Sequence, residues 1–254
     1  MFIINREVFI LKVLDIDMDF FLDRVTMDNH DENRYPDENC EVWDKKEIID
    51  YLENILNLSK DNKIKGKIIM YHNESLDFWN DMINKCQLKT PFTIIHIDSH
   101  SDLDYYQKLD NALLDNAGYD KVLKLPYKER YSVIYGKNSK DKHDRWLNEG
   151  NYLLFAFGFR WIKELIYYTN IKEKYNDDDY DDKYIWNISD KNGIFIKKWK
   201  QDEGYESKIT IITKKCKSKK FCNYDFITFS ISPKYTPKKA DFIVDIIKEY
   251  IEEL

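Results

Sequence analysis

The chain has 254 residues and a formal net charge of −6 at pH 7, with 43% hydrophobic and 34% charged residues. These values predict one globular domain spanning residues 1–254 and argue against a general nucleic-acid-binding protein, which needs a basic surface. We expect no membrane segment and a cytoplasmic location with reduced thiols, because no signal peptide, transmembrane-length apolar run or regular cysteine framework is present.

The first predicted element is a β-strand over residues 8–16, rich in β-branched and large apolar side chains. Three carboxylates at alternate positions, Asp15, Asp17 and Asp19, follow at its end. Alternate side chains of an extended chain share one face, so these carboxylates are predicted to converge. An acidic exposed strand is the simpler alternative to a metal site.

Residues 24–43 are polar and irregular, which predicts a long loop over the site, and His30 within it is interpreted as a surface histidine. A helix is expected to follow from Asp44, its N-cap, because apolar residues recur at spacings of three and four.

A second strand, residues 67–71, ends at His72 and leads into a helix over residues 73–83. His72 and Glu74 therefore lie at a strand-to-helix turn. Ligands of α/β proteins bind at the carboxyl ends of such strands, so His72 is a candidate metal ligand.

A third strand, residues 92–97, is followed by Asp98, His100 and Asp102 at alternate positions. Burying two carboxylates and an imidazole together is very costly unless a cation neutralises them. His96 shares the alternation but lies inside the apolar run, and we interpret it as a core histidine.

The remaining chain predicts further helices and strands without internal repeats. Residues 104–131 are expected to be mostly helical, and 137–143 to form a polar loop. An apolar segment ending at Gly158 follows. Beyond it, the pattern fits either a buried helix at Trp161–Ile166 or a strand at Glu164–Asn170. Antiparallel strands are expected within 192–213, in a small β-extension of the domain over about 185–222. A strand that begins at Phe226 and is stopped by Pro233 follows, and then a helix over Ala240–Glu253.

Two low-complexity stretches are interpreted as solvated loops. Residues 173–184 are acidic and residues 214–220 are basic.

The candidate metal ligands comprise four carboxylates and two imidazoles, which are Asp17, Asp19, His72, Asp98, His100 and Asp102. Two divalent ions sharing carboxylates would balance this charge. A mostly oxygen ligand set with two histidines favours two Mn²⁺ ions over structural zinc. Such a pair usually activates a water molecule for hydrolysis.

The segment Ile97-Asp-Ser-His-Ser-Asp102 resembles the Asp-Ala-His-x-Asp motif of the arginase/ureohydrolase superfamily, and Asp15-Ile-Asp-Met-Asp19 resembles its Ser-Phe-Asp-Val-Asp motif. The chain is more specifically similar to an arginase-like family that includes peptide arginases, through Leu14–Phe21, His72, His96–Leu103, Gly150–Leu153 and Ser230–Thr236.

The resemblance implies an α/β fold of the three-layer arginase/deacetylase type, with a mainly parallel central sheet flanked by helices. Because the strand bearing Asp15–Asp19 comes first, the strand order is expected to be permuted. It also implies hydrolysis of arginine side chains in a ribosomally made precursor peptide, giving ornithine and urea. Arginases are often oligomers, so a homo-oligomer is an expectation by analogy.

Carried over by residue, Asp17 and Asp98 would bridge the two manganese ions. His72 and Asp102 would complete one site, and His100 and Asp19 the other. A competing register uses Asp15 and Asp17 in place of Asp17 and Asp19; otherwise Asp15 supports the ligands.

This sequence has Ser230-Ile-Ser-Pro233 where arginases have a guanidinium-binding glutamate. The catalytic candidates are therefore Glu74 or Glu149 for guanidinium binding, and His143, with His30 as an alternative, for proton transfer. Two further functions remain open: a metal-dependent amidohydrolase or deacetylase acting on another acylated amine, and a non-catalytic metal- or peptide-binding protein.

Overall fold

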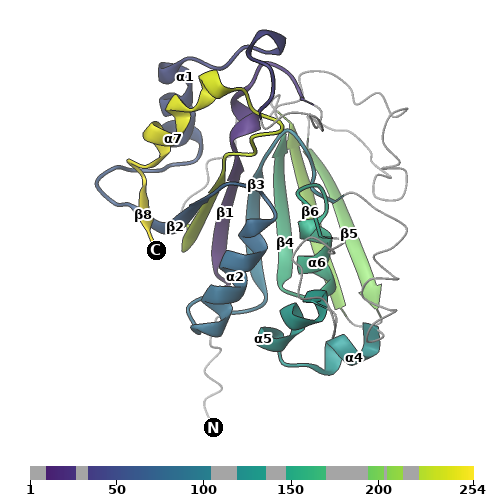
Figure 1. The fold of residues 1–254 in the computed structure, drawn as a ribbon. Helices are drawn as coiled ribbons and strands as arrows, with labels where there is room; N and C mark the ends of the chain where they lie inside the picture. Colours follow the sequence, from purple (N-terminus) through teal and green to yellow (C-terminus); the bar gives the residue numbers. More distant parts are fainter. Residues whose placement is uncertain are drawn as a thin grey trace.

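In the computed structural model, the described residues are 10–26, 34–103, 119–135, 147–169, 194–202, 205–213 and 223–254. Their strands form one sheet in the order β5-β6-β4-β3-β1-β7-β2-β8. Seven neighbouring strands are parallel, and β5 at one edge runs antiparallel to β6. Helices lie over the sheet (Figure 1). This confirms the expected α/β architecture with a permuted strand order.

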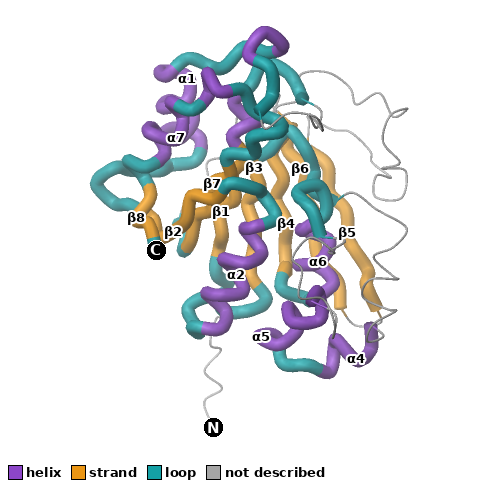
Figure 2. Tube along the Cα trace, in the orientation of Figure 1, coloured by secondary structure: helices purple, strands orange, loops and turns teal. Residues whose placement is uncertain are grey.

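The strands are short and mostly buried in the centre of the sheet. Their bounds are β1 (Lys12–Asp17), β2 (Ile64–Ile69), β3 (Phe92–Ile97), β4 (Ile162–Thr169), β5 (Ile194–Asp202), β6 (Tyr205–Thr213), β7 (Phe226–Ser230) and β8 (Ile251–Glu253). Figure 2 shows β7 between β1 and β2, although more than 100 residues separate it from either in the chain.

The helices divide into two layers. One core cluster packs α2 (Glu74–Asn84), α4 (Tyr119–Lys124), α5 (Tyr127–Arg130) and α6 (Tyr152–Gly158) against one face of the sheet. The other packs η1 (Met18–Phe21), α1 (Lys45–Asp50), the π-helical turn η3 (Tyr51–Ile55) and α7 (Phe242–Ile247) against the opposite face. Short 3₁₀ turns lie at η2 (Asp37–Asn39), η4 (Tyr131–Tyr135) and η7 (Lys238–Ala240).

Alternation along β1 assigns its residues to the two faces. Val13 belongs to the α2 and α6 core, whereas Leu14 and Ile16 belong to the α1 and α7 core. Asp15 and Asp17 share the parity of Val13, so they face α2 and α6. This places the acidic residues on the side of the sheet where β3 presents His96.

Several local predictions are confirmed. Asp44 caps α1 by accepting a hydrogen bond from the Glu47 backbone N–H, and Glu47 returns one to Asp44, forming a capping box. The predicted helix over residues 73–83 is α2, and the predicted antiparallel strands within 192–213 are β5 and β6. Because β6 also pairs with β4, this hairpin continues the central sheet.

Two element boundaries were wrong. The strand predicted from residue 67 begins at Ile64, so Gly66 lies inside β2. Glycine is required there because a Cβ would come within 2.1 Å of the Ile227 carbonyl oxygen on β7. The predicted helix over Ala240–Glu253 ends at Ile247, and Ile251–Glu253 form β8. This strand covers the edge of β2 that would otherwise be unpaired.

Between Trp161 and Asn170, the strand alternative is the correct one. Residues 162–169 form β4, which pairs with β3 on one side and β6 on the other. The helix lies earlier, in the apolar segment Tyr152–Gly158.

Candidate metal centre

The predicted ligands meet at the carboxyl ends of the central strands. Asp17 ends β1 and Asp19 lies in η1 directly after it. Asp98, His100 and Asp102 follow β3, which neighbours β1. His72 follows β2, on the other side of β7. We call Asp17, Asp19, His72, Asp98, His100 and Asp102 the ligand layer.

Within the ligand layer, His72 is the centre of a first cluster. Its Nδ1 lies 3.0 Å from one carboxylate oxygen of each of Asp17, Asp98 and Asp102. Adjacent corners of an octahedron around an ion with ligands at about 2.1 Å are about 3.0 Å apart. The spacing of these atoms therefore suits a shared divalent cation.

A second cluster lies beside the first. His100 Nδ1 is 2.8 Å from Asp19 Oδ2 and 3.7 Å from Asp98 Oδ1. Asp98 directs Oδ2 to the His72 cluster and Oδ1 to the His100 cluster. Asp98 thus belongs to two groups of residues that could each hold a metal ion, which are His72, His96, Asp98 and Asp102, and Asp19, Asp98 and His100.

Three atoms of the first cluster are fully buried and have no hydrogen-bond partner among the residues that the structure describes. They are His72 Nδ1, Asp98 Oδ2 and Asp102 Oδ2. Buried polar atoms are almost always paired, and unpaired ones at one point indicate a missing ligand or ion. A divalent cation would satisfy all three at once, so the residues present fit a metal.

Beneath the ligand layer lies a second set of buried polar side chains. Asp15 accepts hydrogen bonds from Ser75 Oγ at 2.8 Å, from Tyr152 Oη at 2.6 Å and from Thr228 Oγ1. His96 Nδ1 is 3.3 Å from the same carboxylate. His96 and Thr228 are the register partners of Asp15 on β3 and β7. We call these five residues the support layer.

The hydrogen bonds of the two ligand-layer histidines leave one ring nitrogen of each for a metal. His72 Nε2 lies 3.3 Å from Asp15 Oδ2, and His100 Nε2 lies 2.9 Å from the Thr26 carbonyl oxygen. With Nε2 as the donor in each contact, Nδ1 keeps its lone pair for an ion. Such outer contacts orient metal-binding histidines.

The loop after β7 completes the first cluster. Ser232 Oγ donates to Asp17 Oδ2, and Ser230 Oγ lies 2.8 Å from Ser232 Oγ. Both Ser232 and Asp102 adopt positive φ, at 43° and 51°. Non-glycine residues held in this region concentrate at functional sites, where the surrounding structure stabilises the strain.

The ionisation of the ligand layer is strongly perturbed. Burial, and after it the charge of Asp98, raises the pKa of Asp102 to about 7. Burial followed by the charges of Asp98 and Asp17 raises the pKa of Asp19 well above its usual value. For His72, burial lowers the pKa, but Asp15 and Asp102 outweigh burial and raise it well above its usual value. Protons therefore balance the charge that a cation would otherwise balance.

The asymmetric exposure of the layer indicates its open side. The His72 side chain is 1% exposed, whereas that of His100 is 20% exposed. Among the described residues, the second cluster is therefore the more accessible of the two.

The structure brings all six predicted ligands together and separates the two registers of the first motif. Asp17 lies against Nδ1 of His72 and Asp19 against Nδ1 of His100, whereas Asp15 lies in the support layer. His96 is buried in β3 as expected, yet its Nε2 also lies 3.4 Å from Asp98 Oδ2. Interpreting it only as a core histidine missed this contact.

The remaining candidate residues differ in their contacts and in whether the structure describes them. The Glu74 carboxylate accepts a hydrogen bond from the Met70 backbone N–H and closes the turn between β2 and α2. Burial, followed by the charges of Asp17 and Asp102, raises the pKa of Glu149 to about 8. His30 and His143 fall outside the described residues.

Sequence reasoning missed Ser75, Thr228 and Ser232 as contacts of the acidic residues. Alternating hydroxyl residues at positions 228, 230 and 232 were the available signal. Their parity matches that of Asp15 and Asp17, but only the pairing of β1 with β7 shows that the two series face each other.

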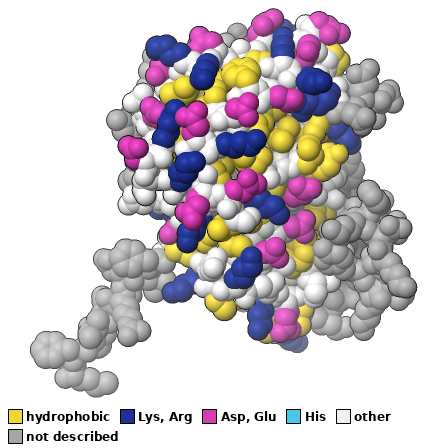
Figure 3. Space-filling view, turned by 60° about the vertical axis from the view of Figure 1, so that its left-hand side comes forward, with side chains coloured by type: hydrophobic (Ala, Val, Ile, Leu, Met, Phe, Trp, Pro, Cys, Tyr) yellow, Lys and Arg dark blue, Asp and Glu magenta, His cyan; other side chains and the backbone are white. Residues whose placement is uncertain are grey.

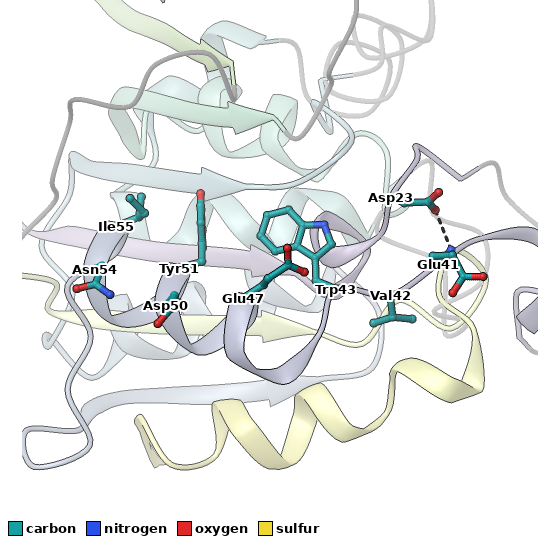
Figure 4. Close-up of a pocket in the computed structure, with 9 residues that line it drawn as sticks. All are labelled: Asp23, Glu41, Val42, Trp43, Glu47, Asp50, Tyr51, Asn54 and Ile55. Atoms are coloured by element: carbon teal, nitrogen blue, oxygen red, sulfur yellow. Dashed lines mark hydrogen bonds between the residues drawn. The ribbon is translucent and has the colours of Figure 1, made fainter.

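A separate open groove lies beside η3, next to Trp43 and Tyr51 (Figure 4). Its carboxylates already have local contacts. Asp23 accepts from the Glu41 backbone N–H, Glu47 belongs to the capping box, and Asp50 pairs with Lys46. None of the predicted metal ligands lines this groove.

The face in Figure 3 carries basic and acidic side chains interspersed with apolar ones. Within the described part of the chain, no helix has the length and apolar character needed to cross a membrane.

Comparison of the sequence with known proteins found no matching protein family and no matching curated protein. The buried His/Asp clusters on a parallel α/β sheet are compatible with a metal-dependent hydrolase.

Proposed function

We propose that this protein is a dimanganese hydrolase that converts arginine side chains of a ribosomally made precursor peptide to ornithine, with release of urea. The carrying observation is the convergence of His72 Nδ1, Asp98 Oδ2 and Asp102 Oδ2, which are buried without hydrogen-bond partners. Asp98 supports a two-ion arrangement, because each of its oxygens faces a different cluster.

The ligand chemistry supports manganese. One ion would be held by Asp17, Asp98, Asp102 and His72. The other would be held by Asp19, Asp98 and His100. In this proposed set four carboxylates outnumber two imidazoles and no thiolate takes part, which suits Mn²⁺ better than Zn²⁺. When bound, such a pair supplies a water nucleophile of lowered pKa.

The chain's own residues would hold the site in one geometry during the reaction. Asp15, fixed by Ser75, Tyr152 and Thr228, orients His72 from beneath. Thr26 orients His100 through its carbonyl group, and the Thr26 hydroxyl is itself bonded to the Tyr235 carbonyl oxygen at 2.7 Å. Water adds to the guanidinium carbon, the bond from that carbon to the side-chain nitrogen breaks, and ornithine and urea form.

A polypeptide substrate is supported by the resemblance to peptide arginases and by the surroundings of His72. Met70 and Tyr71, the two residues before it, are large apolar side chains exposed to 45% and 42%. Adjacent exposed apolar side chains at a site offer contacts that a peptide can use and free arginine cannot.

The test is co-expression of this protein with candidate arginine-containing precursor peptides, followed by mass spectrometry of the peptides. We expect loss of CN₂H₂ at an arginine position, with urea as the co-product. Co-expression with Asp98→Asn is the matched control and should leave the peptides unmodified. Acetate release from acylated amines without urea release would support the deacetylase alternative and contradict this proposal.

A further inference from the structure

The buried imidazole of His96 lies against two oxygens of the first cluster. Its Nε2 is 3.4 Å from Asp98 Oδ2 and 3.8 Å from Asp102 Oδ2. Both oxygens are buried and have no hydrogen-bond partner among the described residues. Ligand atoms about 2.1 Å from an ion lie about 3.0 Å apart at adjacent corners of an octahedron and about 4.2 Å apart at opposite corners. Both distances fall within this interval, so His96 Nε2 can share an ion with the two oxygens.

The place of His96 in β3 brings its ring to the cluster. His96 and Asp98 are two residues apart, so their side chains project from the same face of the sheet. The His96 ring stacks on that of His72, with centroids 5.3 Å apart and an angle of 28° between the planes. The possible ligand atoms of His72, His96, Asp98 and Asp102 all lie within 4.8 Å of one another. The two imidazoles therefore approach the same point from neighbouring positions.

Asp15 holds the two imidazoles in matching orientations. Its Oδ2 lies 3.3 Å from His72 Nε2 and 3.3 Å from His96 Nδ1. An imidazole that donates one N–H to a carboxylate keeps the lone pair of its other nitrogen for a metal. That other nitrogen is Nδ1 in His72 and Nε2 in His96, and both face Asp98 Oδ2. One carboxylate thus prepares both rings to bind the same ion.

A second contact of His96 Nε2 competes with metal binding. This nitrogen also lies 3.3 Å from the His100 backbone carbonyl oxygen. If Nε2 were the donor in a neutral ring, the lone pair of Nδ1 would face the Asp15 carboxylate, and two acceptors would oppose each other. A hydrogen bond to a carboxylate is stronger than one to a neutral carbonyl group. The neutral ring, which is the form that binds metals, is therefore expected to carry its proton on Nδ1.

We propose that His96 is itself a metal ligand and binds the first ion through Nε2, beside His72. The inference rests on the metal centre of the proposed function and is independent of its substrate. The first ion would then have ligands from five described residues, which are Asp17, His72, His96, Asp98 and Asp102, and the second from three, which are Asp19, Asp98 and His100. Because affinity rises with the number and charge of the ligands, the first ion binds more tightly.

The first experiment identifies the ligands without turnover. The protein is loaded with cadmium-113, a divalent ion that NMR detects, and correlation spectra between the ion and the ring protons of histidine are recorded. A histidine gives a correlation only when one of its nitrogens is bonded to the ion. We expect His72 and His96 to correlate with one cadmium resonance and His100 with the other. A correlation from His72 without one from His96 would overturn the proposal.

Two matched variants measure what His96 contributes to affinity. His96→Asn keeps a donor near the position of Nδ1, next to Asp15, and removes Nε2. It should weaken Mn²⁺ binding at the first site by more than about 100-fold, whereas losing a supporting contact typically costs about 10- to 100-fold. Thr228→Val removes a hydroxyl group that donates to the same Asp15 carboxylate and should stay within the smaller range. Equal losses in the two variants would make His96 a supporting residue and contradict the proposal.

Urea release from an arginine-containing peptide separates this inference from the proposed function. Cadmium correlations from His96, in a protein that releases no urea, would overturn the proposed function and uphold the metal-binding role of His96. Urea release by a protein whose His96 gives no correlation would do the reverse. A parent protein that binds neither Cd²⁺ nor Mn²⁺ would overturn both.

Discussion

The ligand layer and the support layer are both buried and contain carboxylates, and β1 contributes Asp17 to the first and Asp15 to the second. The two layers nevertheless differ in how their polar atoms are hydrogen-bonded. Asp15 in the support layer accepts from three hydroxyl groups and lies beside two imidazoles. Asp98 and Asp102 in the ligand layer each keep a buried oxygen that has no hydrogen-bond partner among the described residues. Protein groups satisfy the Asp15 carboxylate in the lower layer, whereas the upper layer keeps buried oxygens that a cation could satisfy.

The electrostatics follow the same division. For Asp15, burial raises the pKa, but the charge and hydrogen bonds of His72 and the hydrogen bond of His96 outweigh it, so its pKa is lowered. For Asp102, burial and the charge of Asp98 prevail, so its pKa is raised to about 7. Asp15 in the support layer is therefore anionic through its contacts, and so is Asp98 in the ligand layer, because the effect of burial on its pKa is outweighed by His100 and His72, which lower it well below its usual value. Asp19 and Asp102, whose pKa values are raised, would release protons when a metal binds.

The largest effect is expected at Asp98, the residue that joins the two clusters. Asp98→Asn should abolish urea release and weaken manganese binding by about 10²- to 10³-fold or more, since removing one partner from a buried set of charges costs roughly 3–5 kcal/mol. Metal content by mass spectrometry and urea release check this. Activity comparable with the parent would contradict a shared carboxylate.

A smaller effect is expected one layer below. Asp15→Asn keeps the size of the side chain but removes its charge, and loss of such a supporting contact typically lowers metal affinity by about 10- to 100-fold. Manganese titration of the purified variant measures this. Metal loss as complete as in Asp98→Asn would instead favour the register in which Asp15 is a ligand.

The pH dependence of stability should distinguish the metal-free from the manganese-loaded protein. Asp102 has a folded pKa of about 7 and an unfolded value near 3.9, so the folded state binds the extra proton between these values. Stability of the metal-free protein therefore falls as pH rises from about 4 to 7. The raised pKa values of His72 and His100 act in the same direction above pH ~6.5.

Because manganese replaces these protons, its stabilising effect should be larger at pH 8 than at pH 5.5, by roughly 1–3 kcal/mol in the free energy of unfolding. Chemical denaturation with and without excess Mn²⁺ at both pH values tests this. An equal manganese effect at the two values would show that no proton is displaced.

The smallest effect is expected at Tyr152. Tyr152→Phe removes the hydrogen bond to Asp15 and the 3.1 Å contact of Tyr152 Oη with His72 Nε2, while four contacts of the Asp15 carboxylate remain. Stability should fall by about 1 kcal/mol and manganese affinity by a few-fold. Tyr250→Phe, which loses a comparable hydrogen bond to Glu53 on a different part of the molecule, is the control. It should lower stability without changing manganese affinity.

The ligand layer was predictable from sequence because its residues follow local rules. Asp98, His100 and Asp102 alternate after an apolar strand, and Asp17 and Asp19 do the same. Each motif can therefore be identified within a few residues of sequence. The α/β class was implied by the resemblance of these motifs to the arginase superfamily. His72 was predictable from its place at a strand-to-helix turn.

The support layer depended on pairings that no short stretch encodes. Asp15 meets Thr228 because β1 pairs with β7, and it meets Tyr152 because α6 packs over that face of the sheet. The choice between Glu74 and Glu149 had the same origin. Only the three-dimensional structure shows that Glu74 closes its own turn, while Glu149 Oε2 is buried with no hydrogen-bond partner in the described part of the chain.

The most direct test of the account is calorimetric titration of the metal-free protein with Mn²⁺ at pH 7.5. The two clusters joined by Asp98 predict two equivalents of manganese per chain, with binding accompanied by proton release. Two equivalents in the parent and fewer than one in Asp98→Asn would agree with the account. Binding of one equivalent or none by the parent protein would contradict it.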